Sequence, residues 1–155
     1  MLSRSPIMVK TTNPDILIRE IDDQDIDQVI ELWQATGVAR PWNNSRKDIS
    51  RASREEQSTI LVAVDGSRIV ATAMVGEDGY RGWAYYVAAD PQQQGSGLGR
   101  MIMEAAESWL EKRGIWKMNL LVHARNAKAL DFYERLGYKD MSTVCLHKVI
   151  RPQPA

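Results

Sequence analysis

The sequence predicts an α/β fold with a mixed, mostly antiparallel central sheet of six to seven strands and helices on both faces. Two observations support this prediction. Runs rich in β-branched residues are separated by Asp-Gly turn signals at 65–66 and 78–79, and elsewhere apolar residues recur at three- and four-residue spacing. A chain of 155 residues with 44% hydrophobic content can bury one core, so we expect a single domain over 15–150. Residues 1–14 are expected to be a flexible extension and 151–155 a flexible tail.

The first half of the chain is expected to place one strand before two helices. Asp22 can cap the first helix, and Gly37 supplies its end. Pro41 prevents that helix from continuing, because proline has no N–H donor. The expected elements are a strand at 16–18, a helix from about 22 to 36, a loop at 38–43 and a polar helix from 44 or 45 to about 57.

The second half begins with an antiparallel meander and ends with alternating helices and strands. The meander is expected because tight turns join three consecutive strand-like runs. Beyond Pro91 the pattern changes to a helical stripe that ends at Gly114. The expected strands are 59–64, 69–75, 83–89 and 117–122, followed by one or two within 141–150, and the expected helices are 98–114 and 127–136.

Composition narrows the class of protein. Twenty basic and twenty acidic residues cancel, so the net charge gives no reason to expect binding to nucleic acid or to an anionic membrane. Cys145 is the single cysteine, and His123 and His147 are too far apart in sequence to suggest a metal site. Without an apolar run typical of a signal peptide or a membrane span, the protein is expected to be cytoplasmic. The oligomeric state, including a homodimer, is left open.

Three glycines alternate at positions 95, 97 and 99, between a strand and a helix. Without Cβ atoms this turn can approach a ligand closely, and its amides and the helix N-terminus can hold a diphosphate. Alternatively, the glycines only permit a tight connection. A nucleoside-triphosphate loop is excluded, because Arg100 and Met101 stand where Lys and Ser or Thr are required. A dinucleotide turn is disfavoured, because Arg100 also occupies the position of its third glycine.

Two motifs resemble the GNAT acetyltransferases. Gln94, Gly97 and Gly99 match the family's coenzyme signature, and residues 126–138 are similar to its following helix and strand. The likeness spans about 16–150 and is nearest to small bacterial members akin to the ribosomal-protein alanine acetyltransferases, including a group with a loop like 40–43. The resemblance implies a GNAT-like sheet and direct transfer of acetyl from acetyl-CoA, without a metal, to a primary amine on a protein N-terminus or a small molecule.

The resemblance also implies roles for individual residues. Main-chain groups of the glycine turn would hold the coenzyme diphosphate, and the edge of the preceding strand would pair with the pantetheine arm. That edge becomes available if the strand ending at Ala89 diverges from the one ending at Val122. The Val87 N–H would then face the thioester oxygen. The implied coenzyme-binding residues are Val87, Ala88, Ala89, Gln94, Gly95, Ser96, Gly97, Leu98, Gly99, Arg100, Asn126, Ala129 and Tyr133.

Two of these residues have other possible functions. Asn126 precedes its helix and is equally suited to capping it, which is the commoner role for asparagine there. Tyr133 follows by two helical turns, so it projects from the same side. It could simply pack, but the matching tyrosine in the family protonates the departing sulfur, and we favour that role.

The general base is harder to predict. Relatives carry a glutamate at the position of Leu121 or of Trp83, and this chain has a carboxylate at neither. Glu77 is our candidate catalytic carboxylate, with Asp78 or a water relay as alternatives, although an acid beside Gly79 also suits a solvated turn. The missing glutamates also leave open a non-catalytic acyl-CoA sensor.

The acceptor amine is expected to meet the loop after the first helix. Arg40, Trp42 and Asn43 are the candidate substrate-binding residues there, since an aromatic ring and an amide could orient a substrate. Alternatively, Trp42 is buried and pins the loop to the core. Tyr85 is a further candidate because simple alternation puts it on the same strand face as Val87.

Overall fold

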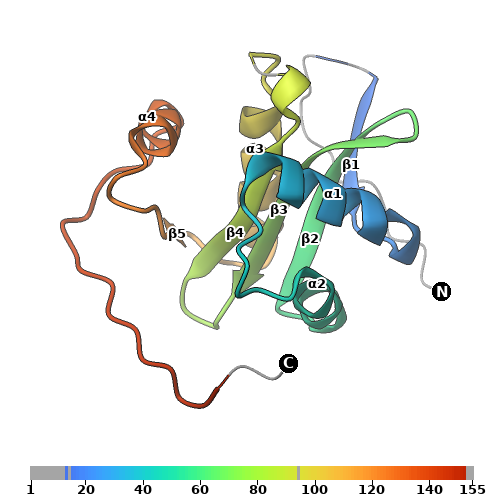
Figure 1. Ribbon diagram of the computed structural model, residues 1–155. Helices are drawn as coiled ribbons and strands as arrows, with labels where there is room; N and C mark the ends of the chain where they lie inside the picture. Colours follow the sequence, from blue (N-terminus) through green and yellow to red (C-terminus); the bar gives the residue numbers. More distant parts are fainter. Residues whose placement is uncertain (1–12, 14, 94, 153–155) are drawn as a thin grey trace. The chain divides into compact units, whose positions relative to one another are not determined.

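A computed structural model describes residues 13, 15–93 and 95–152, which fall into two compact units dividing between Leu120 and Leu121 (Figure 1). The first unit is built on a five-stranded sheet whose strands follow sequence order, β1-β2-β3-β4-β5. Neighbouring strands are antiparallel except β4 and β5, which are parallel, so the predicted mixed and mostly antiparallel sheet is confirmed. The strands are β1 Ile16–Glu20, β2 Ser58–Asp65, β3 Arg68–Glu77, β4 Gly82–Ala89 and β5 Met118–Leu120.

Helices cover both faces of this sheet, as predicted (Figure 1). On one face, Trp33 and Ile49 of the first two α-helices pack with Val62 of β2, and on the other Ile102 of the third packs with Leu61. No described helix is long and apolar enough to cross a membrane. The helical elements are η1 Asp23–Asp25, α1 Ile26–Thr36, α2 Ser45–Arg54, η2 Pro91–Gln93 and α3 Leu98–Glu111.

The predicted helix boundaries have local causes. Gly37 ends α1 at a φ of 76°, a left-handed conformation that glycine adopts without steric cost. Asn44 caps α2, its side chain accepting a hydrogen bond from the Lys47 amide at 3.1 Å. α2 ends at Arg54, slightly earlier than predicted, because Glu55 is already extended.

The second unit contains α4, Ala127–Arg135. The one or two strands predicted within 141–150 are absent from the described chain, so the expected count of six to seven strands is wrong. The apolar alternation gives strand propensity, but a strand also requires a neighbour to pair with its main-chain groups. This segment forms no ladder, and its apolar side chains are exposed, with Val144 at 83% and Leu146 at 88%.

Candidate active site

β4 changes partners along its length. β5 pairs with it only from Gly82↔Met118 to Ala84↔Leu120, whereas β3 pairs with it as far as Ala71↔Ala89. Among the described strands, the last residues of β4 therefore have a ladder on the β3 side only. The strand predicted to end at Val122 ends at Leu120, so β5 provides no ladder for β4 beyond Ala84. A strand edge without a ladder is the kind of edge to which an extended ligand can add.

A bulge interrupts β4 at Tyr86. Thr72 of β3 pairs with Ala88 and Met74 pairs with Tyr85, so two residues of β4 lie opposite one of β3. Tyr86 has a φ of 50°, and this conformation costs a bulky residue about 1–3 kcal/mol. Such strain persists only where the surroundings enforce it.

The bulge corrects one prediction. Tyr85 and Val87 do not share a strand face, because the extra residue breaks the alternation between them. Tyr85 is paired with Met74, which packs towards α1 and α2, whereas Val87 packs on the core under α3. Tyr86 packs against the core cluster that contains Trp33 of α1.

Four side chains hold Tyr86 in place. Its ring stacks on Trp33 with centroids 3.9 Å apart, and its hydroxyl donates to Asp48 Oδ2 at 2.7 Å. Its carbonyl accepts from Thr72 Oγ1 at 3.0 Å, and the same Thr72 oxygen accepts from Trp33 Nε1 at 2.9 Å. Burial, then the Asp48 carboxylate, raise the pKa of Tyr86, outweighing a hydrogen bond with the Asn43 side chain, so the hydroxyl remains a donor.

The glycine turn follows β4 directly. Asp90 anchors its start, since its carboxylate accepts from Arg68 at 3.0 Å and from the Gln92 amide at 2.9 Å. Gly95 and Gly97 have φ values of 83° and 82°, which favour glycine strongly. Gln94, a predicted contact, lies outside the described residues.

The turn leads into α3 with Gly97 at the N-cap. The first intrahelical bond runs from the Met101 amide to the Gly97 carbonyl at 3.0 Å. The preceding amides, of Leu98 to Arg100, lie at the helix end where N–H groups lack intrahelical partners and attract anions. Among the described residues, a Cβ added at Gly95 or Gly97 would meet nothing within 4 Å. This geometry fits a diphosphate.

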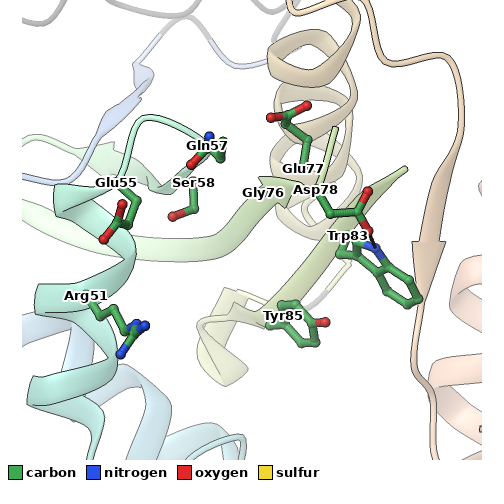
Figure 2. Close-up of a pocket in the computed structure, with 9 residues that line it drawn as sticks. All are labelled: Arg51, Glu55, Gln57, Ser58, Gly76, Glu77, Asp78, Trp83 and Tyr85. Atoms are coloured by element: carbon green, nitrogen blue, oxygen red, sulfur yellow. Dashed lines mark hydrogen bonds between the residues drawn. The ribbon is translucent and has the colours of Figure 1, made fainter. Parts of the chain in front are cut away.

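A pocket of about 410 Å³ lies between the end of α2 and the start of β4 (Figure 2). Arg51 of α2 and Glu55, the residue after α2, form one wall, and Tyr85 and Trp83 form the β4 wall. Tyr85 is 45% exposed there, so its ring can meet a ligand. The remaining lining residues are Gln57, Ser58, Gly76, Glu77 and Asp78.

The two acids predicted as candidate bases, Glu77 and Asp78 at the turn between β3 and β4, differ in role. Asp78 accepts hydrogen bonds from the amides of Arg81 and Tyr80 and from Trp83 Nε1, and these donors lower its pKa. It is therefore a turn cap. Glu77 borders the pocket, but its carboxylate points away from Arg51 and Tyr85 in Figure 2 and accepts from the Gly79 amide at 3.3 Å.

The loop between α1 and α2 carries the other predicted substrate residues. Trp42 is 70% exposed, so the alternative in which it pins the loop to the core is wrong. Arg40 is also exposed, and its carbonyl accepts from the Asn43 amide at 2.9 Å in a turn. Asn43 is half-buried and is the member of this loop that touches Tyr86.

The remaining predicted residues belong to the second unit. Asn126 caps α4, its Oδ1 accepting from the Ala129 amide at 3.1 Å, so the predicted cap is confirmed. Tyr133 meets the rings of Phe132 and Tyr138 edge-on, at 5.0 and 5.8 Å. Burial raises the pKa of Tyr133 to about 12, so its hydroxyl is protonated at neutral pH.

Sequence reasoning missed several residues of this site. Glu55 and Arg51 sit on a polar helix with nothing in their spacing to suggest a pocket. Thr72 lies in a β-branched run and reads as core. The consecutive tyrosines 85 and 86 were the available sequence signal for this pocket. In a regular strand, alternation would place one of the two rings on each face of the sheet.

The chain is thus an α/β protein in which β4 pairs with β5 only as far as Ala84 and is followed by a glycine turn at the N-terminus of α3. The model of the acetyltransferase (GNAT) family matches residues 22–138. The chain therefore belongs to the GNAT acetyltransferases, a family that uses acetyl-CoA.

Solved structures share this fold. A transcriptional regulator from Bacillus halodurans aligns with a TM-score of 0.76 at 21% identity, over 87% of this chain and 99% of its own. AAC(6')-Iy, in complex with a CoA-containing bisubstrate analogue, aligns with a TM-score of 0.76 at 12% identity, over 86% and 97%. The ribosomal-protein-S18-alanine N-acetyltransferase from Escherichia coli aligns with a TM-score of 0.68 at 28% identity, over 79% and 76%.

Proposed function

We propose that this protein transfers acetyl from acetyl-CoA directly to a primary amine of a small molecule or a protein N-terminus. The observation that carries the proposal is that β4 continues beyond its last pair with β5, at Ala84, to Ala89 and is followed by a turn with left-handed Gly95 and Gly97. A strand edge and a diphosphate socket in continuous sequence suit the pantetheine arm and the pyrophosphate of one coenzyme. The S18 acetyltransferase and AAC(6')-Iy support an amine acceptor.

In this proposal the chain contributes three groups to the reaction. The Val87 N–H donates to the thioester oxygen as the amine nitrogen attacks the carbonyl carbon. Tyr133 donates a proton to the sulfur as the carbon–sulfur bond breaks, and its raised pKa keeps that proton in place. Glu77 accepts the proton of the amine through water, since its carboxylate points away from Tyr85. Arg40, Trp42, Asn43 and Tyr85 bind the acceptor.

Turnover with a panel of amines tests the proposal. Free thiol should be released from acetyl-CoA, and Tyr133→Phe should lower kcat by about 10²-fold or more while the Kd for CoA is retained. Tyr138→Phe is the matched control, because that ring is a neighbour of Tyr133 without an assigned role. Equal losses in both variants would contradict a proton-donor role.

A second function is a non-catalytic acyl-CoA sensor. It is favoured by one observation: Glu77 borders the pocket, but its carboxylate points away from Arg51 and Tyr85. Binding of CoA without acetyl transfer to any amine of the panel would select this function over the enzyme.

A further inference from the structure

The contacts at Tyr86 fix more than its ring. Thr72 and Trp33 are each fully buried, at 0% exposure, and their hydrogen bond of 2.9 Å joins β3 to α1. Because the Thr72 oxygen accepts from the indole, its own hydrogen is directed at the Tyr86 carbonyl, 3.0 Å away. This buried pair therefore sets the direction of one main-chain carbonyl.

That carbonyl belongs to the same peptide group as the Val87 amide. A trans peptide is planar, so its C=O and N–H point in opposite directions. Holding the Tyr86 carbonyl towards Thr72 consequently holds the Val87 N–H towards the opposite side, away from β3. At this point of β4 the ladder to β5 has already ended, at Ala84↔Leu120.

We infer that Thr72 and Tyr86 are positioning residues that aim the Val87 N–H at the thioester oxygen. The inference rests on the proposed acetyl transfer. Stacking on Trp33 and the 2.7 Å hydrogen bond to Asp48 hold the tyrosine in its left-handed conformation. Neither side chain needs to touch the substrate, because both act through the peptide between residues 86 and 87.

The same contacts join the acceptor pocket to this peptide. Asp48 and Arg51 are three residues apart on α2, so they lie on neighbouring parts of one helix face. Arg51 lines the pocket, while Asp48 holds the Tyr86 hydroxyl. If α2 shifted when an amine binds, Asp48 would shift with it, and its hydrogen bond to Tyr86 at the bulge would change.

Thr72→Val tests the inference, because valine keeps the shape and removes the hydroxyl. We expect kcat to fall between about 10- and 100-fold, with the Kd for CoA changed less than about twofold. Thr72→Ser keeps the hydroxyl and should restore kcat. Thr59→Val is the matched control, since Thr59 is also a buried strand threonine, at 1% exposure, and its hydroxyl has no hydrogen-bond partner among the described residues. It should leave kcat unchanged.

Amide chemical shifts give a readout that a loss of stability would not reproduce. In the wild type, acetyl-CoA should shift the Val87 amide resonance more than CoA does, and Thr72→Val should abolish this difference. Tyr86→Phe keeps the ring but loses the hydrogen bonds of its hydroxyl to Asp48 and Asn43, and it provides the same measurement if Thr72→Val does not fold. An unchanged kcat and unchanged Val87 difference in a folded variant would overturn the inference. Absence of turnover in the wild type would instead overturn the proposed function.

Discussion

The left-handed residues of this chain serve two different purposes. Gly37 and Gly114 have positive φ where helices end, which is the ordinary use of glycine at a helix terminus. Gly95 and Gly97 have the same conformation before a helix begins, in the segment that follows β4. The φ values alone cannot distinguish the two purposes, but ligand binding can.

Gly97→Ala is expected to weaken CoA binding about tenfold or more, because a Cβ would enter the space that the diphosphate needs. A left-handed alanine also costs about 1–2 kcal/mol of stability. Gly114→Ala is the matched control, with the same φ of 82° and likewise nothing within 4 Å of an added Cβ. It should lose similar stability in urea unfolding but keep the Kd for CoA by calorimetry. Equal effects on binding would show that the turn has only a structural role.

Two glutamates border the acceptor pocket from different elements, Glu77 at the end of β3 and Glu55 after α2. Glu77 is the proposed base, so Glu77→Gln should lower kcat/KM for the amine by about 10²-fold. Glu55→Gln should change KM more than kcat, since that residue only lines the acceptor wall. Measurement of initial rates against amine concentration separates these effects. A larger loss of kcat in Glu55→Gln than in Glu77→Gln would indicate that Glu55 is the base.

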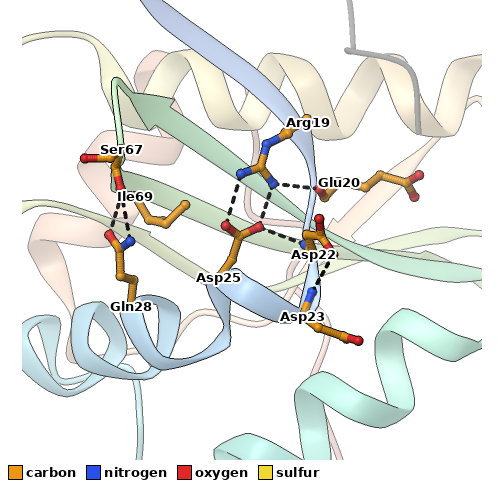
Figure 3. Close-up of polar contacts among 8 residues, drawn as sticks. All are labelled: Arg19, Glu20, Asp22, Asp23, Asp25, Gln28, Ser67 and Ile69. Atoms are coloured by element: carbon orange, nitrogen blue, oxygen red, sulfur yellow. Dashed lines mark hydrogen bonds and ion pairs between the residues drawn. The ribbon is translucent and has the colours of Figure 1, made fainter. Parts of the chain in front are cut away.

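At the scale of elements, one ion pair joins β1 to the start of the first helices (Figure 3). Asp25 is buried, and both its oxygens accept from the Arg19 guanidinium, one at 3.0 Å. The Asp22 amide donates to the same carboxylate at 2.8 Å and completes a capping box. Burial alone would raise the pKa of Asp25, but Arg19 and the Asp22 amide outweigh it, so the pKa is lowered below 3.8.

Asp25→Asn should reduce the free energy of unfolding by about 1–3 kcal/mol at neutral pH, because a partly buried guanidinium loses its partner. A lowered pKa in the folded state gives stability that is present above the ordinary value of 3.8 and is lost as pH falls through the folded value. The difference in free energy of unfolding between wild type and Asp25→Asn should therefore become smaller at acidic pH. Urea unfolding at neutral and acidic pH measures it, with Asp23→Asn as an exposed control. A gap independent of pH would contradict this account.

The elements also show what a single sequence can predict. Apolar periodicity and turn residues were sufficient for α1, α3 and the meander, because those signals are local. The bulge at Tyr86 was not predictable, since it depends on Trp33, Thr72 and Asp48 from three other elements. Propensity likewise suggested strands within 141–150, but this segment pairs with no strand in the part of the chain that the structure describes.

At the scale of the whole molecule, the prediction of a coenzyme-binding turn depended on context more than on glycines. An antiparallel meander before the turn disfavoured the parallel βαβ unit of dinucleotide-binding proteins, and the observed antiparallel pairing of β2, β3 and β4 agrees. The glutamates of relatives had no counterpart here, so the base could not be transferred by resemblance. The pocket beside α2 could be identified only in the folded chain, because its lining residues come from separate segments of the sequence.

Ligand-dependent stability tests the coenzyme class on the intact chain. CoA at 100 times its Kd should stabilise the folded state by about 2.7 kcal/mol, which corresponds to a rise in Tm of about 5–10 °C. ATP and NAD share the adenine and linked phosphates but lack the pantetheine arm, so they cannot pair with β4 beyond Ala84 and should raise Tm less. Gly97→Ala should reduce the CoA shift, and Gly114→Ala should preserve it. A larger shift with ATP or NAD than with CoA would show that the turn serves a nucleotide, and the β4 edge would then have no role in binding.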